Sequence, residues 1–273
     1  MPELPVPESC IEAPPPDRAA VLADLRARIR GLEGLGGEGA RVLPFGLPDL
    51  DGAFPAGGLP LGCLHEVAGE EPGAGTAFAA HLLARLASAA APALWVVRGR
   101  DLHAAGLVAY GLTPDRLIAV RATRDADALW AMEEALRCKR LSAVLGEVGG
   151  LDLTASRRLQ LAAESSGVTG ILLQDASRNA NRRSAASAAV TRWRIAPAPS
   201  WTIEPGVGEP RWRAELERCR GGRPGRWLLE WRDGVLVPAQ GPERAVSTPA
   251  SAPTPVRRPA PAGGHGPSWA EVA

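Results

Sequence analysis

The stretch Cys63-Leu-His-Glu-Val-Ala-Gly-Glu-Glu-Pro-Gly-Ala-Gly-Thr76 decides the fold of this chain. The apolar run Cys63–Val67 predicts a buried strand, and the alanine-rich stretch from Thr76 to about Ala90 predicts a helix. The glycine-rich turn between them stands where backbone N–H groups and a helix N-terminus hold phosphate groups in nucleotide-binding proteins. This order of elements is typical of an α/β protein with a phosphate loop after its first core strand.

The lysine that such a loop requires is missing. The phosphate-binding form is Gly-x-x-x-x-Gly-Lys followed by Ser or Thr. Counted from Gly69, the second glycine position holds Ala74, the lysine position holds Gly75 and the hydroxyl position holds Thr76. We therefore expect weak or no nucleotide binding, no hydrolysis and no cofactor. We interpret the turn as a vestigial phosphate loop that retains Gly69, Gly73, Gly75 and Thr76.

The charges near this turn are also unfavourable for phosphate. Glu70 and Glu71 add two carboxylates. At about 4 Å and an effective dielectric constant of about 20, each repels a phosphate charge by about 4 kcal/mol before screening by salt. Lys139 is the only lysine in the chain and lies on another predicted helix far along the sequence, so it does not replace the missing cation.

Short apolar runs and helical stretches alternate from Arg41 to Pro197. The further predicted strands are Ala93–Val97, Leu117–Arg121, Ala143–Val148, Thr169–Gln174 and Val190–Ile195. Between them, one predicted helical stretch ends at Tyr110, and two others span Ala126–Arg140 and Thr154–Ser165. Strands joined by helices predict a mainly parallel sheet with helices on both faces. Because no helical stretch separates Gln174 from Val190, we expect an antiparallel hairpin at one edge of that sheet.

The segments that flank residues 41–197 differ from this core in composition. Residues 1–16 and 238–273 are predicted to be disordered, and the second segment ends in a peptide around Trp269 that is either a docking peptide or a frayed terminus. In residues 198–237, Trp227–Leu229 and Val235–Val237 are predicted to pair around Asp233-Gly234. Residues 17–40 are predicted to form a helix, over residues 17–33, and a glycine-rich linker. The helix has an apolar stripe suited either to its own domain or to a partner, formed by Leu22, Leu25, Ile29 and Leu32.

The overall composition is that of an ordinary globular protein. The chain has 273 residues with 31 basic and 30 acidic side chains, and the formal net charge of +1 excludes a uniformly basic nucleic-acid binder. No apolar run approaches the roughly 20 residues that span a membrane, and the N-terminus has no apolar signal-peptide core. Because the cysteines do not cluster with histidines at metal-ligand spacing, we expect no metal site, free thiols and a cytoplasmic location. The cysteines are Cys10, Cys63, Cys138 and Cys219.

Arginine and tryptophan are concentrated between residues 178 and 232. Twelve arginines are opposed by five glutamates there, a local balance of +7, and five of the eight tryptophans lie in the same stretch. Arginine forks bind phosphate and exposed indoles stack on bases, but the same residue types also make surface ion pairs and small cores. We favour a core role for the tryptophans. We predict nucleic-acid or partner contacts for a loop with Arg178, Arg182 and Arg183, and for a turn with Arg220, Arg223 and Arg226.

Two stretches of the core resemble RecA-type ATPases. Residues 43–69, which include Gly57-Gly-Leu-Pro-Leu-Gly62 and Glu66, are similar to the segment before the phosphate loop of that family, and Tyr110-Gly-Leu-Thr-Pro-Asp-Arg-Leu-Ile118 is similar to the segment before its third strand. The resemblance implies a RecA-like, mainly parallel sheet flanked by helices, with the predicted N-terminal helix and a small C-terminal β-rich extension added. It places the water-activating glutamate on Gly99 and the magnesium-site acid on Gly146, beside Glu147, so both catalytic acids are expected to be absent.

The C-terminal stretch narrows the resemblance to one group of RecA-related proteins. Arg218-Cys-Arg-Gly-Gly-Arg-Pro-Gly-Arg-Trp-Leu-Leu-Glu-Trp231 is similar to the Arg-x-Arg-Gly-Gly-x-Pro-Gly-x-Trp-x-x-Glu-Trp signature of the ImuA family. This resemblance implies a non-catalytic adaptor of the bacterial DNA-damage (SOS) response that supports error-prone translesion synthesis and mutagenesis. The implied partners are an ImuB-type inactive Y-family polymerase, RecA, and indirectly an error-prone replicative-type polymerase subunit, with single-stranded DNA as a further candidate.

Two other functions compete with the adaptor. An active, DNA-dependent RecA-family ATPase shares the fold, but the missing lysine argues against it. A SulA-like inhibitor of cell division also shares the fold, but it would explain neither the arginine loop nor the C-terminal signature.

Overall fold

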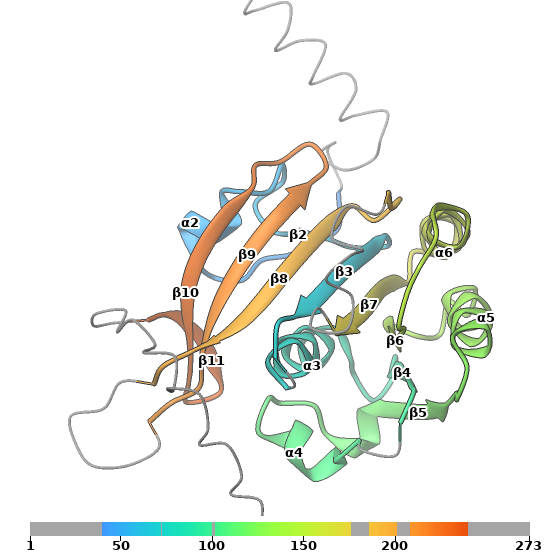
Figure 1. Ribbon diagram of the computed structural model, residues 1–273, viewed down its shortest axis with the longest axis horizontal. Helices are drawn as coiled ribbons and strands as arrows, with labels where there is room; N and C mark the ends of the chain where they lie inside the picture. The colour runs from blue at the N-terminus through green and yellow to red at the C-terminus, as the bar shows by residue number, and fades with distance from the viewer. Residues whose placement is uncertain (1–39, 72, 100–101, 176–185, 201–207, 240–273) are drawn as a thin grey trace, which may run out of the picture. The chain divides into compact units, whose positions relative to one another are not determined.

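A nine-stranded sheet runs through the described part of the chain (Figure 1). The computed structural model describes residues 40–71, 73–99, 102–175, 186–200 and 208–239. The strand order is β11-β10-β9-β8-β3-β7-β6-β4-β5. A separate antiparallel pair is formed by β1 (Val42–Leu43) and β2 (Leu59–Pro60).

The middle of the sheet is parallel, as the alternation of strands and helices predicts. β3 (Leu64–Gly69) pairs with β7 (Thr169–Asp175), and β7 pairs with β6 (Ala143–Glu147). β4 (Ala93–Val97) lies between β6 and the edge strand β5 (Leu117–Arg121). Parallel pairing brings the carboxyl ends of these strands to one side of the sheet, and the turn after β3 lies on that side.

The prediction of an antiparallel hairpin between the fifth and sixth core strands is wrong. β8 (Thr191–Ala198) pairs in parallel with β3, on the side of β3 opposite to β7. The connection spans residues 176–190, which is long enough for the chain to cross β3 and enter the sheet again in the same direction. The absence of a helical pattern in a connection therefore does not imply a hairpin.

Three antiparallel strands extend the sheet beyond β8. β9 (Arg211–Cys219) pairs with β8, β10 (Gly225–Arg232) with β9, and β11 (Val235–Pro238) with β10. The predicted turn at Asp233-Gly234 is confirmed, because both residues have positive φ, 50° and 78°, and Arg232 pairs with Val235. A two-residue hairpin needs this left-handed backbone to match the twist of its strands, and aspartate followed by glycine adopts it readily. The predicted partner of Val235–Val237 was wrong, because these residues pair with Glu230–Arg232 and not with Trp227–Leu229.

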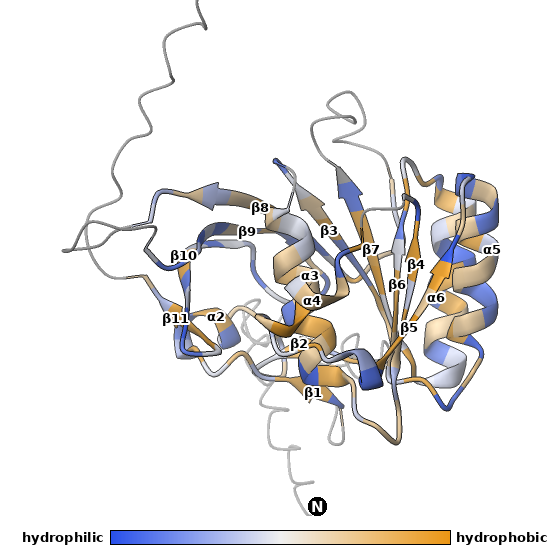
Figure 2. Cartoon of the chain, turned by 90° about the horizontal axis from the view of Figure 1, so that it is seen from below, coloured by the Kyte–Doolittle hydropathy of each residue, from blue (hydrophilic) through white to orange (hydrophobic). Residues whose placement is uncertain are grey.

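Helices cover both faces of the parallel strands (Figure 2). α5 (Asp125–Leu136) and α6 (Leu153–Ser166) lie side by side on one face, and α3 (Ala74–Leu86) and the short α4 (Ala104–Val108) lie on the other. Asp152 caps α6 by accepting a hydrogen bond from the Ala155 N–H at 2.7 Å, and Gly167 ends it with a left-handed φ of 77°. The remaining short elements are α2 (Pro48–Asp51) and a 3-10 turn (Pro114–Arg116). No helix of the described residues is long and apolar enough to cross a membrane.

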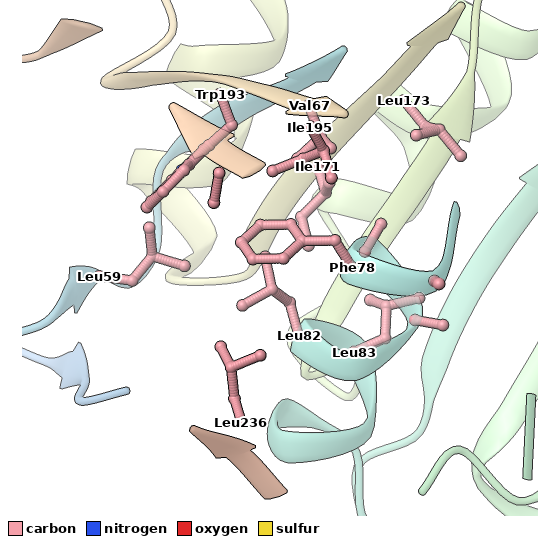
Figure 3. Close-up of a cluster of buried hydrophobic side chains, with 14 of the residues drawn as sticks. Leu59, Val67, Phe78, Leu82, Leu83, Ile171, Leu173, Trp193, Ile195 and Leu236 are labelled. Atoms are coloured by element: carbon pink, nitrogen blue, oxygen red, sulfur yellow. The ribbon is translucent and has the colours of Figure 1, made fainter. Parts of the chain in front are cut away.

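The larger hydrophobic core lies between α3 and the sheet (Figure 3). Phe78 and Leu82 of α3 belong to a buried cluster with Val67 of β3 and Trp193 of β8. Trp193 is fully buried, and its ring centroid lies 5.4 Å from that of Phe78. Leu236 of β11 belongs to the same cluster, so the C-terminal strands share this core with the parallel strands.

The tryptophans of the C-terminal region are core residues, as predicted. Trp193, Trp212 and Trp231 are buried, and Trp227 is half-buried against the same cluster. Trp201 lies outside the described residues. Trp193, Trp212, Trp227 and Trp231 therefore serve packing between the C-terminal strands and α3.

Candidate functional site

The turn after β3 is folded tightly against the strand that it follows. Gly73 precedes α3 with a φ of 92°, and no side chain in the described part of the chain caps this helix. A Cβ atom on Gly75 would lie 2.9 Å from the Cα and 3.0 Å from the N of Gly69, and 3.2 Å from a methyl carbon of Leu173. Any side chain at position 75 therefore requires the backbone of Gly69 to move. The place where a phosphate loop carries its lysine is sterically closed here.

Glu70 of this turn is held by its own chain. Its N–H donates to the carbonyl oxygen of Ile195 at 2.9 Å, and its carboxylate lies 3.5 Å from the guanidinium of Arg194 on β8. Arg194 also forms an ion pair with Glu217 of β9. Because two carboxylates share this guanidinium, Arg194 supplies little net positive charge to the turn. An anionic ligand would also meet Glu71, which is exposed.

Successive residues of β6 point to opposite faces of the sheet, so Gly146, at the expected metal-site position, and Glu147 face different neighbours. Gly146 faces α5, where an added Cβ atom would lie 2.2 Å from Sδ of Met132. Glu147 points to the opposite face, toward the core that contains Trp95 and α3. Its Oε1 accepts a hydrogen bond from Trp95 Nε1 at 2.9 Å, and its Oε2 accepts one from the Arg98 N–H at 3.0 Å. The carboxylate next to the expected metal-site position thus has both oxygens engaged by groups of its own chain.

The position expected for the water-activating acid carries no carboxylate. Gly99 directly follows Arg98, whose Nη1 lies 3.1 Å from Oδ1 of Asp125. The same Asp125 oxygen accepts a hydrogen bond from the Gly149 N–H at 3.0 Å. These contacts tie the ends of β4 and β6 to the start of α5, so the charged groups here stabilise the loops.

His65 and the two buried cysteines are unsuited to catalysis. The ring nitrogens of His65 lie 2.7 Å from Thr191 Oγ1 and 2.9 Å from the carbonyl oxygen of Pro60, and burial lowers the pKa of this histidine to about 4. Burial raises the pKa of Cys63 to about 12 and that of Cys219 to about 11, so neither thiol readily forms a nucleophilic thiolate. Within the described ranges, no group of three His, Cys, Asp or Glu side chains is placed to hold a metal ion.

The arginines of the C-terminal signature surround the turn between β9 and β10. Arg223 donates from its N–H to the carbonyl oxygen of Ala53 at 2.8 Å and from Nη2 to that of Gly52 at 3.1 Å. Nη2 of Arg220 donates to the carbonyl oxygen of Ala188 at 3.1 Å. These two guanidiniums thus bind carbonyl groups of their own chain. The Arg226 side chain is 78% exposed and projects from the sheet while it pairs with Glu215 at 2.7 Å.

Glycines of the same signature allow close packing. A Cβ atom on Gly222 would lie 2.4 Å from the carbonyl oxygen of Ala53 and 2.6 Å from Sγ of Cys219. One on Gly225 would lie 2.4 Å from the ring of Trp227. The turn therefore fits against the segment after α2 only because Gly222 has no side chain, which gives part of the signature a structural role.

Two ion pairs, one buried and one partly buried, were not predicted from the sequence. Arg211 of β9 and Glu230 of β10 lie 2.6 Å apart, and both side chains are only 2% exposed. Glu66 of β3 accepts hydrogen bonds from Nε of Arg192 at 2.7 Å and from the hydroxyl of Ser187. A charged residue inside an apolar strand, such as Glu66, is the sequence signal that could have indicated them.

Several predicted contact residues lie outside the described residues. They are the partner-helix residues Leu22, Leu25, Ile29 and Leu32, the loop residues Arg178, Arg182 and Arg183, and the peptide around Trp269. Their assigned roles stay predictions.

The class of protein follows from the fold. A KaiC-like protein from the hyperthermophilic archaeon Pyrococcus horikoshii, known from a crystal structure, matches 74% of this chain and 100% of its own chain, with a TM-score of 0.50 and 16% sequence identity. At this identity the match shows the fold alone. The chain has a RecA-like fold, with a large, mainly parallel sheet flanked by helices and a C-terminal antiparallel region, and the predicted fold class is confirmed.

The sequence itself defines the family. Protein ImuA from two strains of Caulobacter vibrioides is 46% identical to this chain over 219 residues, which are 76% of this chain and 89% of the relative. No family model matches the chain. The chain belongs to the ImuA family, and the resemblance inferred from its C-terminal stretch is confirmed. Membership of this family and the RecA-like fold support a role in the DNA-damage response.

Proposed function

We propose that this chain is a non-catalytic RecA-like adaptor that supports error-prone translesion synthesis. In this role it contacts an ImuB-type inactive Y-family polymerase and RecA, and through them an error-prone replicative-type polymerase subunit. Single-stranded DNA is a further contact in the proposal, through the loop that carries Arg178, Arg182 and Arg183. The alternatives remain an active RecA-family ATPase and a SulA-like division inhibitor.

The closed turn after β3 is the observation that supports a non-catalytic role. Phosphoryl transfer needs cationic groups at the phosphates, a positioned water and usually a magnesium ion, and each contributes orders of magnitude to the rate. At this turn Gly75 leaves no space for a side chain, and Glu70 already engages Arg194. Glu147, the carboxylate nearest in sequence to the expected metal-site position, uses both oxygens to bind Trp95 and Arg98.

Nucleotide binding and turnover test this part of the proposal. We expect the purified full-length chain to show no magnesium-dependent ATP binding in the micromolar range and no turnover, with or without single-stranded DNA. The Thr76→Ala variant should behave like the wild type in both measurements. Turnover that is lost in Thr76→Ala would instead establish the ATPase alternative.

Separate binding titrations test the partners. The full-length chain is titrated with an ImuB-type protein, with RecA and with single-stranded DNA, and each titration is repeated with Arg178, Arg182 and Arg183 changed to Ala. Binding to the ImuB-type protein and RecA supports the adaptor, whereas binding to a cell-division protein in their place supports the SulA-like alternative. If DNA is held through phosphates, its affinity should fall steeply with salt.

A further inference from the structure

Two large apolar side chains are exposed on neighbouring helices. Trp130 of α5 is 65% exposed and Leu161 of α6 is 64% exposed, the two highest values among the large hydrophobic side chains that the structure describes. Figure 2 shows α5 and α6 as an outer layer of the molecule. Met132, Leu136 and Leu159 are buried on the sheet side of these helices, so Trp130 and Leu161 point away from the sheet. Every other tryptophan in the described ranges is buried or half-buried, and this pair is therefore typical of a surface that another segment covers.

The distance between the two side chains along the helices follows from one ion pair. Glu133 of α5 pairs with Arg158 of α6, so these two residues lie at about the same height. Trp130 precedes Glu133 by three residues, and Leu161 follows Arg158 by three. Each helix connects two parallel strands and runs opposite to them, so the two helices run in the same direction. At a rise of about 1.5 Å per residue, Trp130 and Leu161 are about 9 Å apart along the helix axes.

The first described residues lie beside the end of α6. Nη1 of Arg41 donates to the carbonyl oxygen of Gly167, the residue that ends α6, at 3.3 Å. Residues 34–39, which join the predicted helix over residues 17–33 to this point, are Gly-Leu-Gly-Gly-Glu-Gly. Six residues span up to about 20 Å, and a helix with its side chains has a diameter of about 10 Å. The linker is therefore long enough to pass around α6 and bring residues 17–33 to its outer side.

The apolar stripe of the predicted helix has a spacing that fits this surface. Leu22 and Ile29 are seven residues apart, which places them about 10.5 Å apart on one face of a helix. This distance is close to the separation of Trp130 and Leu161. Leu161 lies six residues before the end of α6, where the linker begins, so the stripe residue near the linker, Ile29, meets Leu161. Leu22 then meets Trp130.

We propose that residues 17–33 form a helix that packs on the outer side of α5 and α6 of its own chain, with Ile29 against Leu161 and Leu22 against Trp130. The short linker holds the helix at an effective concentration in the millimolar range, which favours this chain over a second copy. The contact goes beyond the proposed adaptor function and does not depend on it. While the helix is docked, its stripe is engaged, and a partner reaches these residues only after the helix is released.

Disulfide cross-linking tests this register on the full-length chain. The first double variant is Ile29→Cys with Leu161→Cys, and the second is Leu22→Cys with Trp130→Cys. A disulfide forms only where the two Cα atoms come within about 7 Å of each other. We expect both double variants to form an intramolecular disulfide under mild oxidation, read as a monomer of altered mobility on a non-reducing gel. A disulfide between two chains would assign the stripe to a second copy and overturn the proposal.

Controls on α6 distinguish a docked helix from one that moves freely. They combine Ile29→Cys with Thr154→Cys or with Ser165→Cys, at exposed positions two turns before and one turn after Leu161. All variants carry Cys10→Ser and Cys138→Ser, because the two remaining native cysteines are buried. The bond to position 161 should form at least about fivefold faster than either control bond. A freely moving helix would react fastest at position 165, nearest the linker, and this result or equal rates would refute the contact.

Hydrogen exchange provides a second measurement with the native cysteines in place. The amides of residues 17–33 should be protected in the wild type, and Trp130→Glu with Leu161→Glu should make them exchange at least about tenfold faster. The control is Ile118→Glu with Val235→Glu, which makes the same change at exposed apolar positions on the edge strands β5 and β11 and should leave the protection unchanged. No protection in the wild type, or protection that survives in the first variant, overturns the proposal. Protection that arises only when an ImuB-type protein or RecA is added would also overturn it, while supporting the adaptor function.

Discussion

Restoring the missing lysine should not restore a nucleotide site. A comparison of motifs predicts that Gly75→Lys completes the phosphate loop and creates ATP binding. The structure predicts a loss of stability in its place, because the new Cβ atom would lie 2.9 Å from the Cα of Gly69 and 3.0 Å from its N. The chain can accept the side chain only if the turn moves away from the end of β3.

The expected loss can be worked out from two opposing contributions. Overpacking against the main chain costs about 1–3 kcal/mol. Lysine in place of glycine in the first turn of a helix recovers up to about 0.7 kcal/mol of helix propensity. The net loss is about 0.3–3 kcal/mol, and at about 2–4 °C per kcal/mol for a domain of this size the melting temperature should fall by about 1–12 °C.

Calorimetry of three variants tests this reasoning. Gly75→Ala has the same Cβ atom without the charge and should show most of the same loss of melting temperature. Ala126→Lys is the matched control, since it adds a lysine at an exposed position in the first turn of α5 and should melt within about 1 °C of the wild type. None of the variants should bind magnesium-ATP. A Gly75→Lys protein that melts like the wild type and binds ATP with micromolar affinity would show that the turn opens without cost and that the steric argument is incorrect.

Three further predictions concern the core. Glu230→Ala should lower the free energy of unfolding, measured with denaturant, by about 3–5 kcal/mol, because it leaves Arg211 buried without this partner. Arg211→Met combined with Glu230→Leu should lose much less. A double variant that is less stable than Glu230→Ala would contradict this reasoning. His81 is buried, and neither of its ring nitrogens has a hydrogen-bond partner among the residues that the structure describes. Burial lowers its pKa from 6.5 to about 4, so the unfolded chain binds the proton between these pH values and stability falls as pH decreases through them. His81→Leu should therefore be more stable than the wild type by up to about 3 kcal/mol at pH near 4, with a smaller gain at pH 7, and an unchanged pH dependence would refute the assignment. Gly222→Ala should cost about 1–3 kcal/mol, because its Cβ atom meets the carbonyl oxygen of Ala53, and hydrogen exchange should quicken at the β9–β10 turn.

The strand and helix pattern of the core could be predicted because local signals there are strong. Buried parallel strands are short apolar runs, and Asp233-Gly234 is a hairpin turn for reasons of backbone twist alone. The position of β8 could not be predicted, because the sequence does not show on which side of β3 the chain returns. Strand order depends on contacts between residues that are far apart in the chain, such as Val67 and Trp193.

The sequence shows which residue types occupy the candidate site, but it shows less well where their side chains point. The missing lysine at Gly75 can be read by counting, but the lack of space there depends on how closely two glycine backbones approach. Gly146 and its neighbour Glu147 lie on opposite faces of β6, and the sequence alone does not show which of the two faces α3, because a shift of one residue reverses the faces. The roles of Arg220 and Arg223 could not be predicted either, because the carbonyl groups that they bind belong to distant segments.

The shared core of β8 and the C-terminal strands has a consequence during synthesis on the ribosome. β8, whose core face carries Trp193, has been synthesised once the chain reaches Ala198. The strands β9 to β11, which continue the sheet beyond β8, are complete only at Pro238. At about 5–20 residues per second, the part of this apolar core face that the C-terminal strands cover stays exposed in the nascent chain for roughly 2–8 s. Chaperones that capture apolar segments should therefore associate with this chain late in translation and leave when β11 emerges from the exit tunnel.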